Sequence, residues 1–380
     1  MKTVLGIERV DEFRQLFDNK RVGLITNPTG IDSNFKTSID ILKETTNLVS
    51  LFSPEHGIRG NLQAGVHLDT YVDEKTNATV FSLYGKTRKP NEEMMSTLDV
   101  LAMDIQDGGS RFYTYIYTMA YAMMACKEFD KEFVIFDRPG PIGVKDFEGN
   151  ILDIEYRSFV GYYPILQRYG MTIGELAYMF NEEFGIGCKL HIIPMKNYNR
   201  DMLYSDTKLP WVAPSPNFPT VETAYVYNGT CIFEGTNLSE GRGTTKPFEI
   251  VGAPWIDGFK YAEELNKLNL PGVYFRPFYF TPMFSKCEKE LCGGVQLHIL
   301  DLKLFKPVKT GWAMLKIVRD MYPNDFKINA PYVEGRPCML DYNTGGDFMR
   351  KDIHTLEELF AIIERDTAIF AKTREKYLLY

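Results

Sequence analysis

The sequence lacks the short motifs that mark several large enzyme classes. No G-x-G-x-x-G follows the first predicted strand, which disfavours a dinucleotide enzyme, and no G-x-x-x-x-G-K-[ST] is present, which excludes a P-loop nucleotide hydrolase. The G-x-S-x-G turn of the serine hydrolases is missing as well. Carboxylates, arginines, hydroxyls and tryptophan remain as the groups that could carry chemistry.

Cysteine pairs and basic clusters are scarce too. None of the 6 cysteines forms a CxxC pair, and the 5 histidines are scattered, so we predict neither a metal site nor a cofactor. The formal net charge is −7 and no block of Lys and Arg occurs. A surface for nucleic acid is therefore not expected.

Long apolar runs are absent. No segment approaches the roughly 20 apolar residues of a spanning helix, so membrane insertion is not expected. The first nine residues, MKTVLGIER, contain neither an apolar core nor a cleavage site of the kind found in signal peptides. We expect a cytoplasmic protein, or a periplasmic or secreted one if a signal has been removed.

Four apolar segments each run into reactive polar residues. The segments are Arg21–Thr26, Leu48–Ser53, Val100–Met103 and Phe133–Phe136. Continuous apolar runs of this length are typical of strands buried on both faces, so we predict an α/β fold with a doubly wound parallel sheet. Such sheets bind ligands at the carboxyl ends of their strands. The sequence therefore predicts an active site along one rim of the sheet.

We place a domain boundary near residue 150, after a segment rich in Pro and Gly. Residues 1–150 would form the sheet domain and residues 151–380 a second α/β domain with longer loops. Helices are predicted at Tyr113–Phe129, Met171–Phe184, Lys309–Met321 and Leu356–Lys372. Thr172 and Glu175 have the spacing of a capping box. Residues 209–255 are predicted to form a long loop, and long loops in compact domains are usually functional.

Glu55 is the strongest candidate on the rim. A carboxyl group that is partly removed from water can stay protonated near neutrality and act as a general acid. The alternative is an acid that caps the next turn. His56 could shuttle a proton, donate a hydrogen bond to a substrate, or be an ordinary loop histidine. Arg59 and Arg111 could hold a substrate carboxylate.

Other rim residues are candidates for substrate contact, and the three aspartates among them are alternatively ion-pair partners of these arginines. These rim residues are Asn27, Asp104, Asp107 and Asp137.

A second polar cluster spans residues 233–245. It contains Glu234, Asn237, Glu240 and Arg242 among three glycines and several hydroxyls, which indicates a ligand-contacting loop. Upstream, the segment Pro210–Asn217 adds a rigid backbone with Trp211 and Asn217. Tryptophan faces often stack on sugar rings, although Trp211 could equally belong to the core.

Eight separated motifs resemble one family over residues 5–380. They are LITNPTGID, FSPEHGIRG, DIQDGGSRFYTYI, FDRPGP, YGMTIGELA, LPWVAPSPNFP, FEGTNLSEGRGTTKPFE and KYLLY. In type and order they are similar to those of the NamZ-type exo-β-N-acetylmuramidases, a glycoside hydrolase family. One departure is Gly140, because the family commonly has Asn in the DRPNP motif.

The resemblance implies a Rossmann-like first domain, a second α/β domain and an active site in the cleft between them. It also implies release of N-acetylmuramic acid from the non-reducing end of peptidoglycan fragments, with Glu55 at the position of the proposed catalytic glutamate. Glu234 or Glu240 would activate water or orient the substrate, or the substrate's own 2-acetamido group would be the nucleophile. Arg59, Arg111 or Arg242 would bind the lactyl carboxylate.

These assignments require that Glu55 and Arg242 face each other across a sugar-sized hollow. Two alternatives remain at this point. One is a muropeptide-binding protein without catalysis. The other is a sugar-phosphate or nucleotide-sugar transferase, for which Gly108–Arg111 would be the phosphate cradle. We expect peptidoglycan-derived saccharides as partners, and an oligomer could form.

Overall fold

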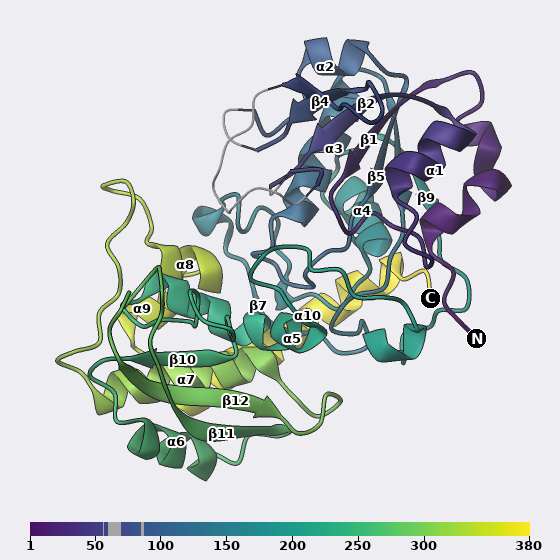
Figure 1. Cartoon of the computed structure of the whole chain (residues 1–380). Helices are drawn as coiled ribbons and strands as arrows, with labels where there is room; N and C mark the ends of the chain where they lie inside the picture. Colours follow the sequence, from purple (N-terminus) through teal and green to yellow (C-terminus); the bar gives the residue numbers. More distant parts are fainter. Residues whose placement is uncertain (56, 60–69, 85–86) are drawn as a thin grey trace.

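The computed structural model describes residues 1–55, 57–59, 70–84 and 87–380, and its first part is built around a seven-stranded sheet (Figure 1). The strand order is β3-β4-β2-β1-β5-β6-β9. All neighbours are parallel except β3 and β4. The strands are β1 Arg21–Thr26, β2 Asn47–Ser53, β3 Tyr71–Val72, β4 Thr79–Ser82, β5 Val100–Asp104, β6 Glu132–Phe136 and β9 Lys189–Ile193. The predicted α/β fold with a parallel sheet is confirmed.

Helical segments cover both faces of this sheet. The 3₁₀ helix η1 (Gly6–Leu16) and α1 (Ser38–Thr45) pack on one face, and α2 (Glu92–Ser96), α3 (Tyr115–Glu128) and α4 (Ile173–Glu182) on the other. Successive strand residues alternate between the two cores: Val100 and Ala102 belong to the first, Leu101 and Met103 to the second. This alternation explains why the central strands are apolar at nearly every position.

The first part continues well past residue 150. Its last strand, β9, pairs with β6, and α4 packs against both of these strands. The loop rich in Pro and Gly at residues 139–143 follows β6 but does not end the unit. The predicted boundary is therefore corrected, because a strand that pairs with β6 is contributed by a later part of the chain.

The second part contains the antiparallel sheet β10-β12-β11 and several helices. Its strands are β10 Ile250–Ala253, β11 Val273–Phe280 and β12 Cys292–Ile299, and a small ribbon pairs β7 (Glu148–Ile151) with β8 (Leu166–Arg168). The helices are α5 Val221–Thr230, α6 Gly258–Lys267, α7 Pro307–Met321, α8 Met339–Thr344, α9 Phe348–Lys351 and α10 Leu356–Arg374. Short 3₁₀ turns are η2 Ile154–Tyr156, η3 Tyr204–Thr207, η4 Cys231–Gly235 and η5 Glu375–Tyr377.

The C-terminal tail returns to the first part after α10 (Figure 1). The Tyr380 hydroxyl donates to Asp137 at 2.7 Å and accepts the Met195 amide at 2.8 Å. The Leu379 amide donates to Glu175 at 2.8 Å. The end of the second part is thus bonded to the residue after β6, to α4 and to the loop after β9.

Candidate active site

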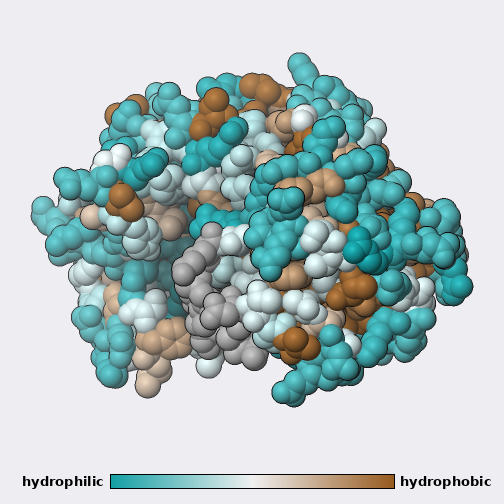
Figure 2. All heavy atoms as spheres, turned by 90° about the horizontal axis from the view of Figure 1, so that it is seen from above, coloured by the Kyte–Doolittle hydropathy of each residue, from teal (hydrophilic) through white to brown (hydrophobic). Residues whose placement is uncertain are grey.

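Residues from both parts of the chain line one cleft. The space in and above it that atoms do not fill is about 470 Å³, which includes open solvent. Figure 2 shows a largely hydrophilic face with a hollow between the two parts. The lining residues are Glu55, Phe112, Tyr113, Thr114, Tyr115, Ser215, Asn217, Phe218, Tyr227, Arg242 and Phe248. Glu55 and Arg242 therefore line the same hollow, as the sequence analysis required.

Glu55 lies just beyond the carboxyl end of β2, half-buried at the wall of the cleft. The Thr114 hydroxyl donates to its Oε2 at 3.1 Å. Burial and the Glu55 carboxylate, which is hydrogen-bonded to the Tyr84 phenol, raise the pKa of Tyr84 to about 12. Thr114 is also the residue that precedes α3, so the carboxyl group lies near the start of that helix. The protein thus holds this carboxyl group in place with two hydroxyls.

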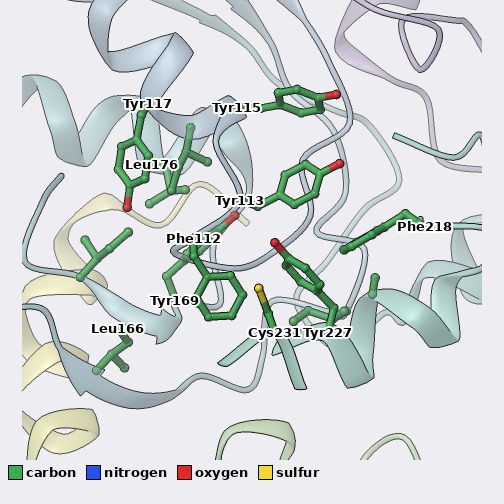
Figure 3. Packing of buried hydrophobic residues seen from close by; sticks show 14 of the residues in the cluster. Phe112, Tyr113, Tyr115, Tyr117, Leu166, Tyr169, Leu176, Phe218, Tyr227 and Cys231 are labelled. Atoms are coloured by element: carbon green, nitrogen blue, oxygen red, sulfur yellow. The ribbon is translucent and has the colours of Figure 1, made fainter. Parts of the chain in front are cut away.

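Three of the lining residues are tyrosines, Tyr113, Tyr115 and Tyr227, and they lie close together in the buried cluster of Figure 3. The ring of Tyr113 meets that of Tyr115 edge-on, with centroids 5.0 Å apart, and that of Tyr227 at 5.9 Å. Burial raises the pKa of all three phenols above the ordinary value. They therefore stay neutral at physiological pH, and the Tyr115 hydroxyl donates to the Pro214 carbonyl at 2.7 Å.

Arg242 supplies the positive charge of the cleft. Its guanidinium lies 5.0 Å from the Phe248 ring centroid, pairs with Glu234 at 2.5 Å and lies 3.3 Å from a Glu240 oxygen. Burial lowers the pKa of Arg242, but the two carboxylates outweigh it and raise that pKa above its ordinary value. Among the described residues that line the cleft, Glu55 is the one with a carboxyl group and Arg242 the one with a positive charge.

The segment before α5 contributes part of the wall. Ser215 and Asn217 line the cleft. Trp211 does not line it: its ring packs edge-on against Tyr204 at 5.3 Å, and its indole N–H donates to the Phe218 carbonyl at 3.4 Å. Trp211 supports the segment from behind, so the alternative of a packing tryptophan fits the structure better than sugar stacking.

Three predicted substrate contacts are corrected, because their side chains are completely buried. Asp104 pairs with Arg138 at 2.5 Å. Arg111 donates to the carbonyls of Asn150, Ile165 and Asn343, so Gly108–Arg111 does not form an open phosphate cradle. Asp137 accepts the hydrogen bond of Tyr380 and others from the start of α4. All three fasten loops at the rim to the body of the protein.

Further candidates lie outside the cleft lining. Asp107 is 5% exposed and is bonded to the Tyr169 hydroxyl, and burial raises the pKa of its carboxyl to about 6. Asn27 is buried beside the Tyr115 hydroxyl. The Asn237 amide group binds the backbone of residues 325 and 327. Arg59 pairs with Asp73 at 2.6 Å.

His56 lies outside the described residues, so its predicted role stays a prediction.

The two candidates for a second catalytic carboxyl group are engaged in ion pairs. Glu234 pairs with Arg242, and Glu240, 1% exposed, lies between Arg242 and Lys286. Neither is among the residues that line the cleft. Their position indicates that they hold Arg242 rather than face a substrate.

Sequence reasoning did not find the phenols or Phe248. Tyr113 and Tyr115 were assigned to the apolar helix that begins there, and Tyr227 to a loop. The sequence did offer one indication of the role of Tyr113 and Tyr115. They lie at the start of a helix that follows the end of a strand at the rim. Among the described residues, no group of three or more His, Cys, Asp or Glu side chains could hold a metal ion. No described helix is long and apolar enough to cross a bilayer.

Comparison with known proteins covers the whole chain. The model "Exo-beta-N-acetylmuramidase NamZ, N-terminal" matches residues 22–222, and "Exo-beta-N-acetylmuramidase NamZ, C-terminal" matches residues 225–380. The peptidoglycan beta-N-acetylmuramidase NamZ of Bacillus subtilis (strain 168) is 49% identical over 385 residues, which cover 100% of this chain and 92% of that protein.

Two crystal structures of DUF1343 family proteins from Bacteroides fragilis NCTC 9343 are also similar. One has a TM-score of 0.91 at 40% identity, and the other a TM-score of 0.76 at 36% identity. Each comparison covers 100% of this chain and 99% of the other.

Proposed function

Because the chain belongs to the NamZ exo-β-N-acetylmuramidase family, we propose that it is an exo-acting glycoside hydrolase that releases N-acetylmuramic acid from the non-reducing end of peptidoglycan fragments. The observation that supports this most directly is the cleft itself. It places one carboxyl group, Glu55, and one guanidinium, Arg242, on a layer of neutral phenols. An acid for the leaving group and a cation for an acidic sugar are the two groups that this reaction needs.

Glu55 is the general acid in this proposal. Its protonated carboxyl group gives a proton to the glycosidic oxygen while the bond from that oxygen to the anomeric carbon breaks. The hydroxyl groups of Thr114 and Tyr84 orient the carboxyl group and stabilise the carboxylate that remains. The departing sugar thus leaves as a neutral alcohol.

The lining favours the substrate's own acetamido oxygen as the nucleophile. Glu234 and Glu240 are both engaged in ion pairs and do not line the cleft, so a second enzyme carboxylate is not in place to activate water. In the proposed route the acetamido oxygen bonds to the anomeric carbon as the leaving group departs. The Glu55 carboxylate then takes a proton from the water that opens the ring intermediate.

Arg242 binds the lactyl carboxylate of muramic acid in this arrangement. The planar guanidinium suits bidentate contact with a carboxylate, and Phe248 supports one of its faces. Phe112 and Phe218 pack behind the cleft wall and support it. The neutral groups of Ser215 and Asn217 supply hydrogen bonds without adding charge.

Substitution of Glu55 tests the proposal. Glu55→Gln should reduce the release of sugar from a chromogenic N-acetylmuramide by about 10²–10⁴-fold, the range for loss of a general acid. The thermal unfolding midpoint and the affinity for N-acetylmuramic acid should stay close to wild type. A folded Glu55→Gln variant with wild-type turnover would refute the role of Glu55.

The same assay separates the alternatives. A wild-type protein that binds muropeptides without releasing sugar would be a binding protein, and one that requires a nucleotide sugar would be a transferase. Peptidoglycan-derived saccharides are the partners we propose. The cytoplasmic location and the oligomeric state stay predictions.

A further inference from the structure

The loop that carries Arg242 is held by a lysine from another element. Lys286 lies in the turn between β11 and β12, and its ammonium group donates to the carbonyls of Phe233 at 2.6 Å and Thr236 at 3.1 Å. The same group pairs with the Glu240 carboxylate at 2.7 Å. The turn is bonded to the loop a second time, through the Met283 amide and the Gly243 carbonyl at 2.9 Å. Lys286 therefore fixes both the backbone and a carboxylate next to Arg242.

The four charged groups alternate in sign. Lys286 pairs with Glu240, Glu240 with Arg242, and Arg242 with Glu234. The Glu240 side chain is only 2% exposed, so its charge is compensated mainly by these two cations and little by water. The negative charge of Glu240 is therefore neutralised partly by Lys286 and partly by Arg242.

This sharing decides how much of the Arg242 charge is left for a ligand. With Lys286 present, the four groups sum to zero, and the guanidinium is balanced by one carboxylate, Glu234, together with part of the Glu240 charge. Without Lys286 the sum is −1, and Arg242 would have to compensate two carboxylates alone. An anionic ligand that approaches Arg242 would then meet a net negative charge in a partly desolvated cleft, where charges interact more strongly than in water.

We propose that Lys286 is a positioning residue that sets the preference of the cleft for an anionic sugar. It neutralises part of the Glu240 charge and thereby leaves more of the Arg242 charge for a substrate carboxylate, while its bonds to the loop keep the guanidinium in the cleft. This inference rests on the proposed function, in which Arg242 meets the lactyl carboxylate. Lys286 itself does not line the cleft.

Lys286→Met tests the proposal with two substrates: a chromogenic N-acetylmuramide with a free lactyl carboxylate, and its uncharged methyl ester. The KM for the free acid should rise on the order of three- to tenfold, while the KM for the ester and both kcat values should change less than about twofold. Lys286→Arg should retain the wild-type preference. Lys289→Met is the matched control, because Lys289 lies in the same turn, is 74% exposed and pairs only with its neighbour Glu288 among the ion pairs of the described residues.

A second substitution separates charge from general support of the loop. The double variant Lys286→Met/Glu240→Gln removes both charges of the pair. The charges that remain, on Arg242 and Glu234, then sum to zero. The KM for the free acid should therefore move back towards the wild-type value. If the single variant fails to fold, this double variant and Lys286→Arg carry the test, because removing a whole buried pair is often tolerated.

Equal losses for the two substrates, or a double variant worse than the single one for the acid alone, would overturn the role of Lys286. A wild-type protein that cleaves neither substrate would instead refute the proposed function.

Discussion

Asp137 is a buried carboxyl group that fastens the C-terminus and has no part in the cleft. Burial and the neighbouring negative charge of Glu175 raise the pKa of Asp137 to about 7. Between about pH 4 and pH 7 the folded state therefore holds a proton at this site that the unfolded state has released. The free energy of unfolding should fall as the pH rises through this window, by at most about 4 kcal/mol from this group.

Asp137→Asn should flatten this pH dependence. The amide oxygen can accept the bonds from the Arg138 and Gly174 amides, and the amide nitrogen can donate to the hydroxyl groups of Thr172 and Tyr380. The difference in unfolding free energy between pH 5 and pH 8, measured with urea, should become smaller than in wild type. Some pH dependence should persist, because the pKa of Asp107 is raised as well.

Asp11→Asn, at an exposed ion pair, is the control and should leave the pH dependence unchanged. A variant of Asp137 with an unaltered dependence would contradict the shifted titration of this carboxyl group.

At the scale of single residues, the sequence predicted which rim segments matter better than which side chains face the ligand. Glu55, Asn217 and Arg242 were found because each lies in a polar segment that reaches the cleft. Asp104 and Arg111 lie in similar segments, yet their side chains point into the protein and bind Arg138 or backbone carbonyls. The direction of a side chain after a strand end depends on tertiary partners, which local sequence does not reveal.

Among the elements, α4 begins with a capping box that is buried and bonded further. The Thr172 hydroxyl accepts the Glu175 amide at 3.2 Å and donates to Asp137 at 2.8 Å. Thr172→Ala should lower the free energy of unfolding by about 2 kcal/mol, since it removes a cap and leaves a buried carboxyl group short of a donor. Chemical denaturation of the purified variant measures this directly.

The start of α10 offers a matched control. Thr355 forms the same capping box with Glu358, but in an exposed position. Thr355→Ala should therefore cost only about 1 kcal/mol. Equal losses for the two variants would show that the bond from Thr172 to Asp137 adds nothing to stability.

Element prediction succeeded where the pattern was local. The capping box of α4, the apolar helix α3 and the long helix α10 were all predicted to within a few residues. The helix α5 was missed inside the supposed loop of residues 209–255, because all of its residues from Thr223 to Thr230 are buried. A helix that is enclosed on every side has no polar face, so the periodic signal that reveals surface helices is missing.

For the whole molecule, the tail after α10 bonds the second part of the chain to the first. Tyr380→Phe removes the donor to Asp137 and the acceptor of the Met195 amide. The free energy of unfolding should fall by about 1–2 kcal/mol, with a lower thermal midpoint. Tyr332→Phe, at a side chain that is 85% exposed, should leave the midpoint unchanged. An unaltered midpoint for the Tyr380 variant would mean that this anchorage does not contribute to stability.

The extent of each part could not be predicted from composition. The amino-acid composition does change after Asp137, where Pro and Gly become frequent. However, β9 comes from some 50 residues later and completes the first sheet. Parallel pairing between distant segments leaves no mark in the intervening sequence. Only the seven strands together show where the first part ends.

The residues that we propose as proton donor and as anion-binding group, Glu55 and Arg242, lie far apart in the sequence. Glu55 falls within residues 22–222 and Arg242 within residues 225–380, the two segments matched by separate family models. Neither segment by itself contains both reactive groups. In the proposed function one sugar contacts both residues, so the distance between the two parts sets whether binding and proton transfer can occur on the same molecule.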